Sequence, residues 1–287
     1  MKIISNSISL AAATYGEVCR QAVYYVLLGL FAFLLFAAQY LTLFNFSQQN
    51  QALREMAAAS LPLWGFLAAI VLSGSLVTAE FESQAIITLL AKPIGRGTYL
   101  AGRYLGLLAA LALGLLFLGL AIVGTLWMSE GLPALDRLGL IGADRLHPDV
   151  SVVEFTSAFL RTTALPIFQA GILALGQVAI LAALTVGLSP FLSAVATAGV
   201  VCSAYLLGHL APHLIRALDV SDSAWLTALS AFFYTVLPHL EDFRDASLDR
   251  GGLGSAGTLV LSAVYAALYA GALLTGAAAG FRNRDIG

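Results

Sequence analysis

Residues 104–128 read YLGLLAALALGLLFLGLAIVGTLWM, a run without a single Asp, Glu, Lys or Arg. A helix that crosses the hydrocarbon core of a membrane needs about 20 consecutive, mostly apolar residues, so this run is long enough to span one. It is continuous and rich in Leu and Ala, whereas strands of a membrane barrel alternate apolar and polar residues over about ten positions. The run therefore predicts a transmembrane helix in an all-α integral membrane protein.

Other runs along the chain have the same character, and together they predict six transmembrane helices. These are Val23–Phe44, Leu61–Ala79, Tyr104–Met128, Leu165–Leu188, Phe191–Leu210 and Thr258–Ala279. Of the 287 residues, 60% are hydrophobic and 10% are charged, whereas roughly 25% are charged in a soluble domain. We therefore expect a single membrane domain over residues 1–287, embedded in a lipid bilayer, with no soluble domain and no nucleic-acid partner.

The charge distribution favours one orientation. Six spans put both termini on one side, where the segments are short, lie close to span ends and carry a net positive charge. The segments on the other side are longer and net negative, although Lys and Arg are equally numerous on the two sides. Because the positive-inside rule acts on short segments beside span ends, we expect both termini in the cytoplasm and the chain in the cell (inner or plasma) membrane. The N-terminal residues lack the compact apolar core of a signal peptide, so we expect them to stay on the chain.

The entry into the first two spans carries two local signals. Residues 3–20 place apolar side chains at three- and four-residue intervals, which predicts an amphipathic elbow helix along the membrane surface. Ser60 suits a helix N-cap and Pro62 suits the first turn, where a missing N–H does no harm. These two residues predict that the second span helix begins near position 60.

Two outer segments contain further helical patterns. In segment 129–161, Ser151–Glu154 has the spacing of a capping box and predicts a short interfacial helix. In segment 212–254, apolar residues recur at helical spacing over residues 225–240, a stretch too short to span a membrane. This second pattern predicts an interfacial or re-entrant helix before the last span.

The connection after the second span, EFESQAIITLLAKPIGR at residues 80–96, is too elaborate for a simple turn. It combines acids, an apolar ridge on a short helix, a proline that ends the helix and two flanking bases. In that order they are Glu80 and Glu82; Ile86, Ile87, Leu89 and Leu90; Pro93; Lys92 and Arg96. Glu80 and Glu82 lie two apart, on different helix faces, which argues against a paired carboxylate site. The ridge suits insertion into a groove on a soluble partner, and an amphipathic loop resting on the bilayer explains it equally well.

No nucleotide or catalytic site is predicted in the chain itself. It contains no Gly-x-x-x-x-Gly-Lys-Ser/Thr sequence, so any ATP hydrolysis must come from a partner and the chain is not expected to be an enzyme. The Gly-x-Gly-x-x-Gly match at residues 252–257 lacks the strand that a dinucleotide site needs before it. His209 and His213 are four apart, as metal ligands on one helix face would be, but Pro212 lies between them and interfacial anchoring is favoured. We predict no metal site.

Polar and small residues inside the spans have two readings each. Gln39, Gln169 and Gln177 are the candidates for lining a transport pathway, although interhelical hydrogen bonding without a transport role is favoured. Small-residue faces occur at 102–106 and 276–280 as Gly-x-x-x-Gly. They allow close helix approach, either in this chain or between protomers.

Four stretches together resemble the ABC-2 type transporter permeases. They are TYGEVCRQAV (14–23), the segment 80–96 with its LLAKPIGR ending, LPHLEDF (237–243) and FRNRD (281–285). The chain is most similar to permeases of multi-copper enzyme maturation and gliding-motility systems. The resemblance covers nearly the whole chain, and Leu-Leu-x-Lys-Pro is its most specific part. The long segment 129–161 is larger than a minimal member needs.

The resemblance implies an elbow helix, six spans, a cytoplasmic coupling helix within 80–98 and re-entrant helices before the sixth span. It further implies two permease subunits, identical or different, working with two P-loop ATPase subunits that hold the ATP and Mg, and we expect the complex to be an exporter. No cofactor is expected on this chain, and three Met without a Cys-rich cluster do not support a copper substrate. The alternatives are a secondary transporter or channel without an ATPase, or a membrane scaffold that transports nothing.

Overall fold

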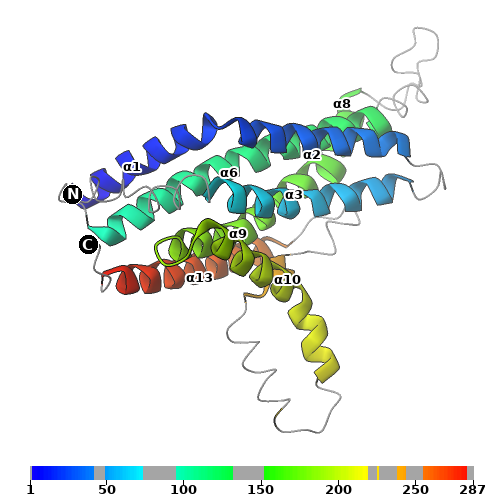
Figure 1. Cartoon of the computed structure of the whole chain (residues 1–287). Helices are drawn as coiled ribbons and strands as arrows, with labels where there is room; N and C mark the ends of the chain where they lie inside the picture. The colour runs from blue at the N-terminus through cyan, green and yellow to red at the C-terminus, as the bar shows by residue number, and fades with distance from the viewer. Residues whose placement is uncertain are drawn as a thin grey trace, which may run out of the picture.

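The computed structural model describes residues 2–41, 49–73, 95–131, 152–218, 225, 238–243 and 255–282, and this part of the chain is helical without a strand. Its elements are α1 (Lys2–Cys19), α2 (Ala22–Leu41), α3 (Gln49–Ser73), α6 (Arg96–Leu126), the π-helical η2 (Trp127–Gly131), α8 (Val152–Phe159), the π-helical η3 (Leu160–Ala164), α9 (Leu165–Leu188), α10 (Ala194–Leu218), the 3-10 turn η4 (Leu240–Phe243) and α13 (Ala256–Arg282) (Figure 1). The predicted all-α fold class is confirmed over these residues.

Four of the described helices are long and apolar enough to cross a membrane: Arg54–Leu72, Arg96–Ser129, Phe155–Leu188 and Ala256–Phe281. The pair α1 and α2, bent by 61° at the break between them, passes the same test and raises the number to as many as five. The apolar part of α10, Ala194–Leu210, is shorter. These helices indicate a membrane-embedded protein, while the count of six spans stays a prediction.

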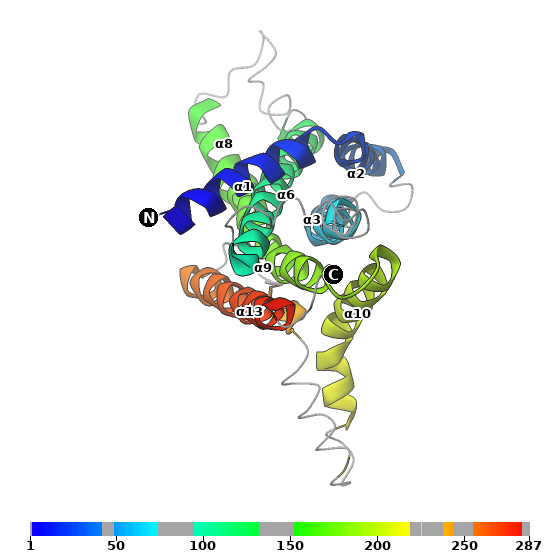
Figure 2. The same cartoon turned by 60° about the vertical axis from the view of Figure 1, so that its left-hand side comes forward.

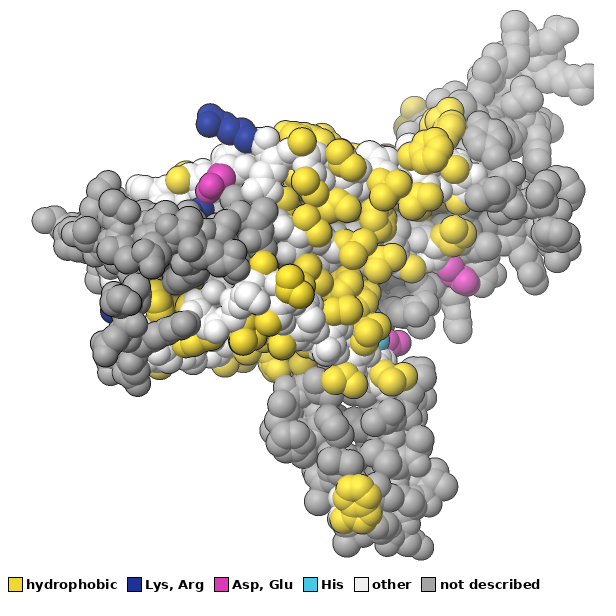
Figure 3. Space-filling view, viewed as in Figure 1, with side chains coloured by type: hydrophobic (Ala, Val, Ile, Leu, Met, Phe, Trp, Pro, Cys, Tyr) yellow, Lys and Arg dark blue, Asp and Glu magenta, His cyan; other side chains and the backbone are white. Residues whose placement is uncertain are grey.

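The surface has the layout that a bilayer requires. Figure 3 shows apolar side chains gathered in a broad band across the middle of one face, with charged side chains toward the edges of that band. Many large apolar side chains are exposed on the helices, including Phe33 at 65% and Leu268 at 71%. Such a surface is stable only against lipid or another apolar surface, because a soluble monomer rarely exposes large contiguous apolar patches.

The centre of the bundle is formed by α6 and α9, which pack against each other and against α3 and α13. Glycines allow the close approach. Trp64 of α3 is fully buried and fills the space beside Gly114 of α6, where an added Cβ would collide with the indole ring. The side chain of Val178 from α9 packs against Gly65, the next residue of α3, where an added Cβ would collide with it. Helix α3 is therefore interlocked with α6 and with α9, in each case by a side chain that packs opposite a glycine.

Two helix starts differ from the sequence prediction. The second span helix, α3, begins at Gln49, so Pro62 lies inside the helix instead of in its first turn. The predicted short interfacial helix does form, as α8 from Val152, but it continues through η3 into α9 as one helix. In both places the continuous helix keeps paired the backbone N–H and C=O groups that a helix end would leave without an intrahelical partner.

The chain ends of the described bundle lie together. The start of α1, the start of α6 and the end of α13 are at the same end of the bundle (Figure 1). The residues of the predicted elbow, 3–20, correspond to the helix α1, which crosses α6 near this end (Figure 2), while its role as an elbow on the membrane surface stays a prediction. We call this the inner end, and the opposite end, where α13 begins, the outer end.

Candidate functional site

The inner end is the candidate site because the predicted coupling segment, 80–98, leads directly into α6 there. Only its last residues, from Gly95 onward, are among the described residues. The other residues proposed for the partner contact lie outside the described part: Glu80, Glu82, Ile86, Ile87, Leu89, Leu90, Lys92 and Pro93. The site is therefore built from the helices to which this segment connects.

Arg96 ties the first turn of α6 to the last turn of α13. Its Nη1 donates a hydrogen bond of 2.6 Å to the carbonyl oxygen of Phe281, and its guanidinium lies 5.2 Å from the centre of the Phe281 ring. Carbonyls in the last turn of a helix have no intrahelical donor, so a cation at this position satisfies one of them and faces the negative end of the helix dipole. Phe281 is itself only 1% exposed, so the packing around its ring holds the partner of Arg96 in a fixed position.

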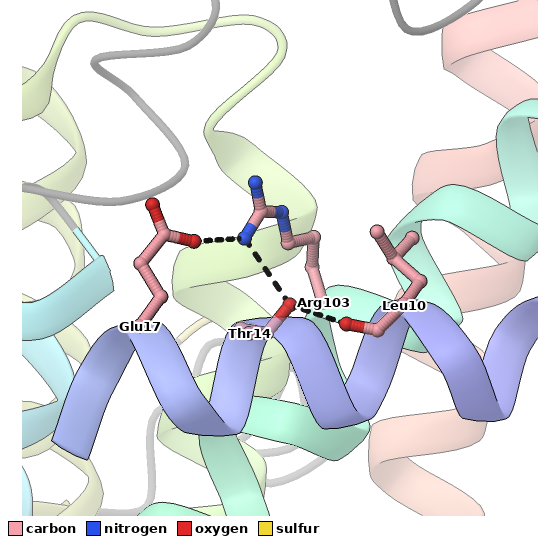
Figure 4. Close-up of polar contacts among 4 residues, drawn as sticks. All are labelled: Leu10, Thr14, Glu17 and Arg103. Atoms are coloured by element: carbon pink, nitrogen blue, oxygen red, sulfur yellow. Dashed lines mark hydrogen bonds and ion pairs between the residues drawn. The ribbon is translucent and has the colours of Figure 1, made fainter. Parts of the chain in front are cut away.

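Arg103 ties α6 to α1. Although it is an arginine, it is only 4% exposed. Its Nη1 lies 2.8 Å from Glu17 Oε2 and 3.1 Å from Thr14 Oγ1, and the Thr14 hydroxyl donates in turn to the carbonyl oxygen of Leu10 at 2.9 Å (Figure 4). The Thr14 hydroxyl therefore accepts a hydrogen bond from Arg103 and donates one to the backbone of its own helix. The charge of a buried Arg is offset by this carboxylate and hydroxyl together.

Two glycines of α6 let α1 approach this closely. An added Cβ on Gly102 would lie 2.8 Å from Leu10 Cδ2, and one on Gly106 would lie 2.5 Å from Thr14 Cβ. The first small-residue face predicted from the sequence is therefore occupied within the chain by α1. At such short separations the backbones of the two helices are in contact, and van der Waals packing adds to the ion pair.

Sequence reasoning missed the partnership of Glu17 and Arg103. The signal was available, since each is a lone charge next to an apolar run, but they are 86 positions apart and no local pattern pairs them. Arg96 was singled out as a flanking base. Its contact with Phe281, 185 positions away, was equally beyond local reasoning.

The pathway candidates lie elsewhere in the bundle. Gln177 of α9 is 3% exposed, and its Nε2 lies 3.1 Å from His209 Nε2 of α10, so the two side chains form an interhelical hydrogen bond. The other His209 nitrogen, Nδ1, lies 3.0 Å from the carbonyl oxygen of Tyr205. Gln169 is also on α9, half-buried. The side chains of Gln39 and His213 lie outside the described residues.

A metal site finds no support in the part of the chain that the structure describes. No group of three or more His, Cys, Asp or Glu side chains there is placed to hold an ion. Both ring nitrogens of His209 already lie within hydrogen-bonding distance of protein atoms.

Comparison of the chain with models of known protein families, and with curated protein sequences, found no match. At the inner end, α6 is joined to α1 by an ion pair and to α13 by a cationic hydrogen bond. This arrangement can transmit a displacement of the segment before α6 to two other helices at once.

Proposed function

We propose that this chain is the membrane permease subunit of an ATP-driven exporter, worked by a separate P-loop ATPase. One observation carries the proposal. The segment with the Leu-Leu-x-Lys-Pro motif directly precedes α6 in the sequence, and at the inner end Arg96 and Arg103 tie the start of α6 to α13 and α1. A force applied to this segment therefore has a direct mechanical route into the bundle.

In the proposed mechanism the ridge of Ile86 to Leu90 sits in a groove of the ATPase. ATP binding and closure of the ATPase subunits push on the ridge, and the push reaches the first turns of α6. Because α6 also packs against α9 and α3 in the core, the tilt of α6 changes the packing at the centre of the bundle. The ATPase must bind two conformations of the permease with different affinity for this coupling to operate.

The proposal includes a second permease subunit, identical or different, and both termini in the cytoplasm. Positive charge in the short inner segments supports that orientation. Two rivals, a secondary transporter or channel and a membrane scaffold, need no ATPase to work. They differ from our proposal in one measurable respect, which is whether ATP hydrolysis in the complex depends on the ridge.

The test is co-purification from native membranes. The tagged chain should bring down a protein with a P-loop, identified by mass spectrometry, together with ATP hydrolysis. The double variant Ile87→Asp/Leu90→Asp should lose both, because two carboxylates cannot enter an apolar groove without large desolvation cost. Size-exclusion chromatography in detergent shows whether the variant permease is still folded.

A matched control uses the same chemical change at the outer end. Val153 of α8 is 76% exposed, so Val153→Asp removes an apolar side chain and adds a charge away from the inner end. It should keep the ATPase. If the ridge variant is folded and still retains the ATPase as the control does, the assignment of residues 80–96 as the coupling segment is wrong.

A further inference from the structure

The short turn η4 enters the bundle beside α9 and α10. Its two apolar side chains, Leu240 and Phe243, are 1% and 5% exposed. Leu240 packs over Gly208 of α10 and Phe243 over Gly176 of α9, so that a Cβ added to these glycines would lie 2.8 Å and 2.6 Å from them. The turn is thus seated in the bundle by two side chains that fit over glycines.

The same turn is also held by α13. The backbone N–H of His239 donates to the hydroxyl of Tyr265 at 3.1 Å, and the ring of Phe243 lies 6.0 Å from that of Tyr265. Tyr265 lies nine residues from Ala256, where α13 begins at the outer end, and 17 residues from Arg282, where α13 ends at the inner end. The turn is therefore closer to the outer end of α13 than to its inner end.

Helix geometry gives the depth of η4. With a rise of 1.5 Å per residue, Gly176 lies about 18 Å from Leu188, where α9 ends at the inner end. The outer charged level is marked by Arg54, whose Nη2 donates to the Thr163 hydroxyl at 3.2 Å. Thr163 lies roughly 20 Å beyond Gly176 along the same helix. Phe243 therefore sits near the middle of the bundle, well within a hydrocarbon core of about 30 Å.

Two acids occupy this depth. Asp242, which directly precedes Phe243, is exposed, and Glu241 is half-buried. A carboxylate facing lipid at such a depth is costly, and irregular backbone at membrane depth occurs only where it is buried in protein or lines water. From these constraints we infer that Glu241 and Asp242 line a water-filled vestibule that opens to the side of the membrane opposite the chain termini. The two adjacent carboxylates give its wall a negative potential that attracts cations.

The test is the accessibility of a cysteine to charged, membrane-impermeant thiol reagents in sealed vesicles of both orientations. The background carries Cys19→Ser and Cys202→Ser, which remove the two native thiols. Asp242→Cys should react from the outer face only. The matched control is Val264→Cys, on α13 one position before Tyr265 and 49% exposed on the apolar surface. It should not react, because a thiol in lipid does not ionise and the reagent does not reach it.

A marker and a charge test complete the experiment. Ile8→Cys, on α1 and 61% exposed, marks the face that holds the termini. At Asp242→Cys a cationic methanethiosulfonate should react about tenfold faster than an anionic one, and Glu241→Gln should reduce that ratio. If Asp242→Cys does not give folded protein, Glu241→Cys is measured in the same way.

Labelling of Asp242→Cys from the face opposite to Ile8→Cys, with Val264→Cys silent, supports the vestibule. Absence of labelling in folded protein, labelling from the termini side, or equal labelling of Val264→Cys overturns it. Because no ATPase is needed for this measurement, the outcome is independent of the proposed exporter function.

Discussion

At the scale of single residues, the chain uses its few charges as ties between helices. Arg96 and Arg103 each contact a residue on another helix that is distant in the sequence, and Arg103 is almost wholly buried. A buried charge in a helix pair costs free energy unless it is matched, so its presence gives the pair a fixed register. Glycines also fix how helices pack, because only a position without a Cβ leaves room for a large side chain from the neighbouring helix.

Gly114 offers the sharpest test of that packing. In Gly114→Ala the new Cβ would overlap the fully buried ring of Trp64, and we expect the free energy of unfolding to fall by about 1–3 kcal/mol, as overpacking does. The matched control is Gly119→Ala in the same helix, where a Cβ would meet nothing within 4 Å. The control should be neutral or stabilising by up to about 1 kcal/mol, because Ala favours the helix. Thermal unfolding in detergent measures both, and equal stability of the two variants would contradict the interlock.

At the scale of elements, α1 behaves as part of the bundle and not as a loose surface helix. It packs along the first turns of α6 through Gly102 and Gly106 and bends by 61° into α2. The amphipathic pattern predicted the helix itself, while its docking depends on glycines in a distant helix. The apolar stripe alone is equally compatible with a helix that lies only on lipid.

A disulfide tests that docking. In a background without Cys19 and Cys202, Leu10→Cys and Gly102→Cys should cross-link on mild oxidation, because an added Cβ on Gly102 would lie 2.9 Å from Leu10 Cβ. The control pair replaces the second site by Leu116→Cys, on the same helix, 48% exposed and about 21 Å further along. Mass-spectrometric detection of the linked peptides is the readout. Cross-linking of both pairs, or of neither, would show that α1 is not fixed on α6.

At the scale of the whole molecule, the two ends of the bundle have different characters. The inner end gathers the start of α1, the start of α6 and the end of α13 around Arg96 and Arg103 (Figure 1). The turn η4 carries Glu241 and Asp242, for which we propose access to water from the outer end. Proposed coupling and proposed water access are therefore on opposite sides, as export across a membrane requires.

The arrangement of the chain ends predicts the topology of the whole protein. Reporter fusions at the N-terminus and at the C-terminus should report the same compartment, and the positive inner segments predict that it is the cytoplasm. Paired fusions of a fluorescent protein active in the cytoplasm and a phosphatase active outside it measure this. Opposite results at the two termini would require an odd number of spans and would rule out six.

Hydropathy alone determined that this is a helical membrane protein and where most of its long helices run. The predicted end of the fourth span at Leu188 agrees with the structure, because a bilayer selects continuous apolar runs, whereas the helix extends back beyond Leu165 through η3 to α8. The predicted start of α3 was wrong. Ser60 and Pro62 are local signals, and the helix continues through them back to Gln49, because local propensity is a weak guide to where a helix begins in a folded chain.

Tertiary structure decided which of the sparse polar residues meet. The pairs Arg103–Glu17 and Gln177–His209 join residues 86 and 32 positions apart, and η4 reaches the middle of the bundle only because glycines of other helices receive Leu240 and Phe243. A periodic pattern describes one face of one helix, whereas a contact between helices depends on shape and charge at positions that only the folded chain brings together.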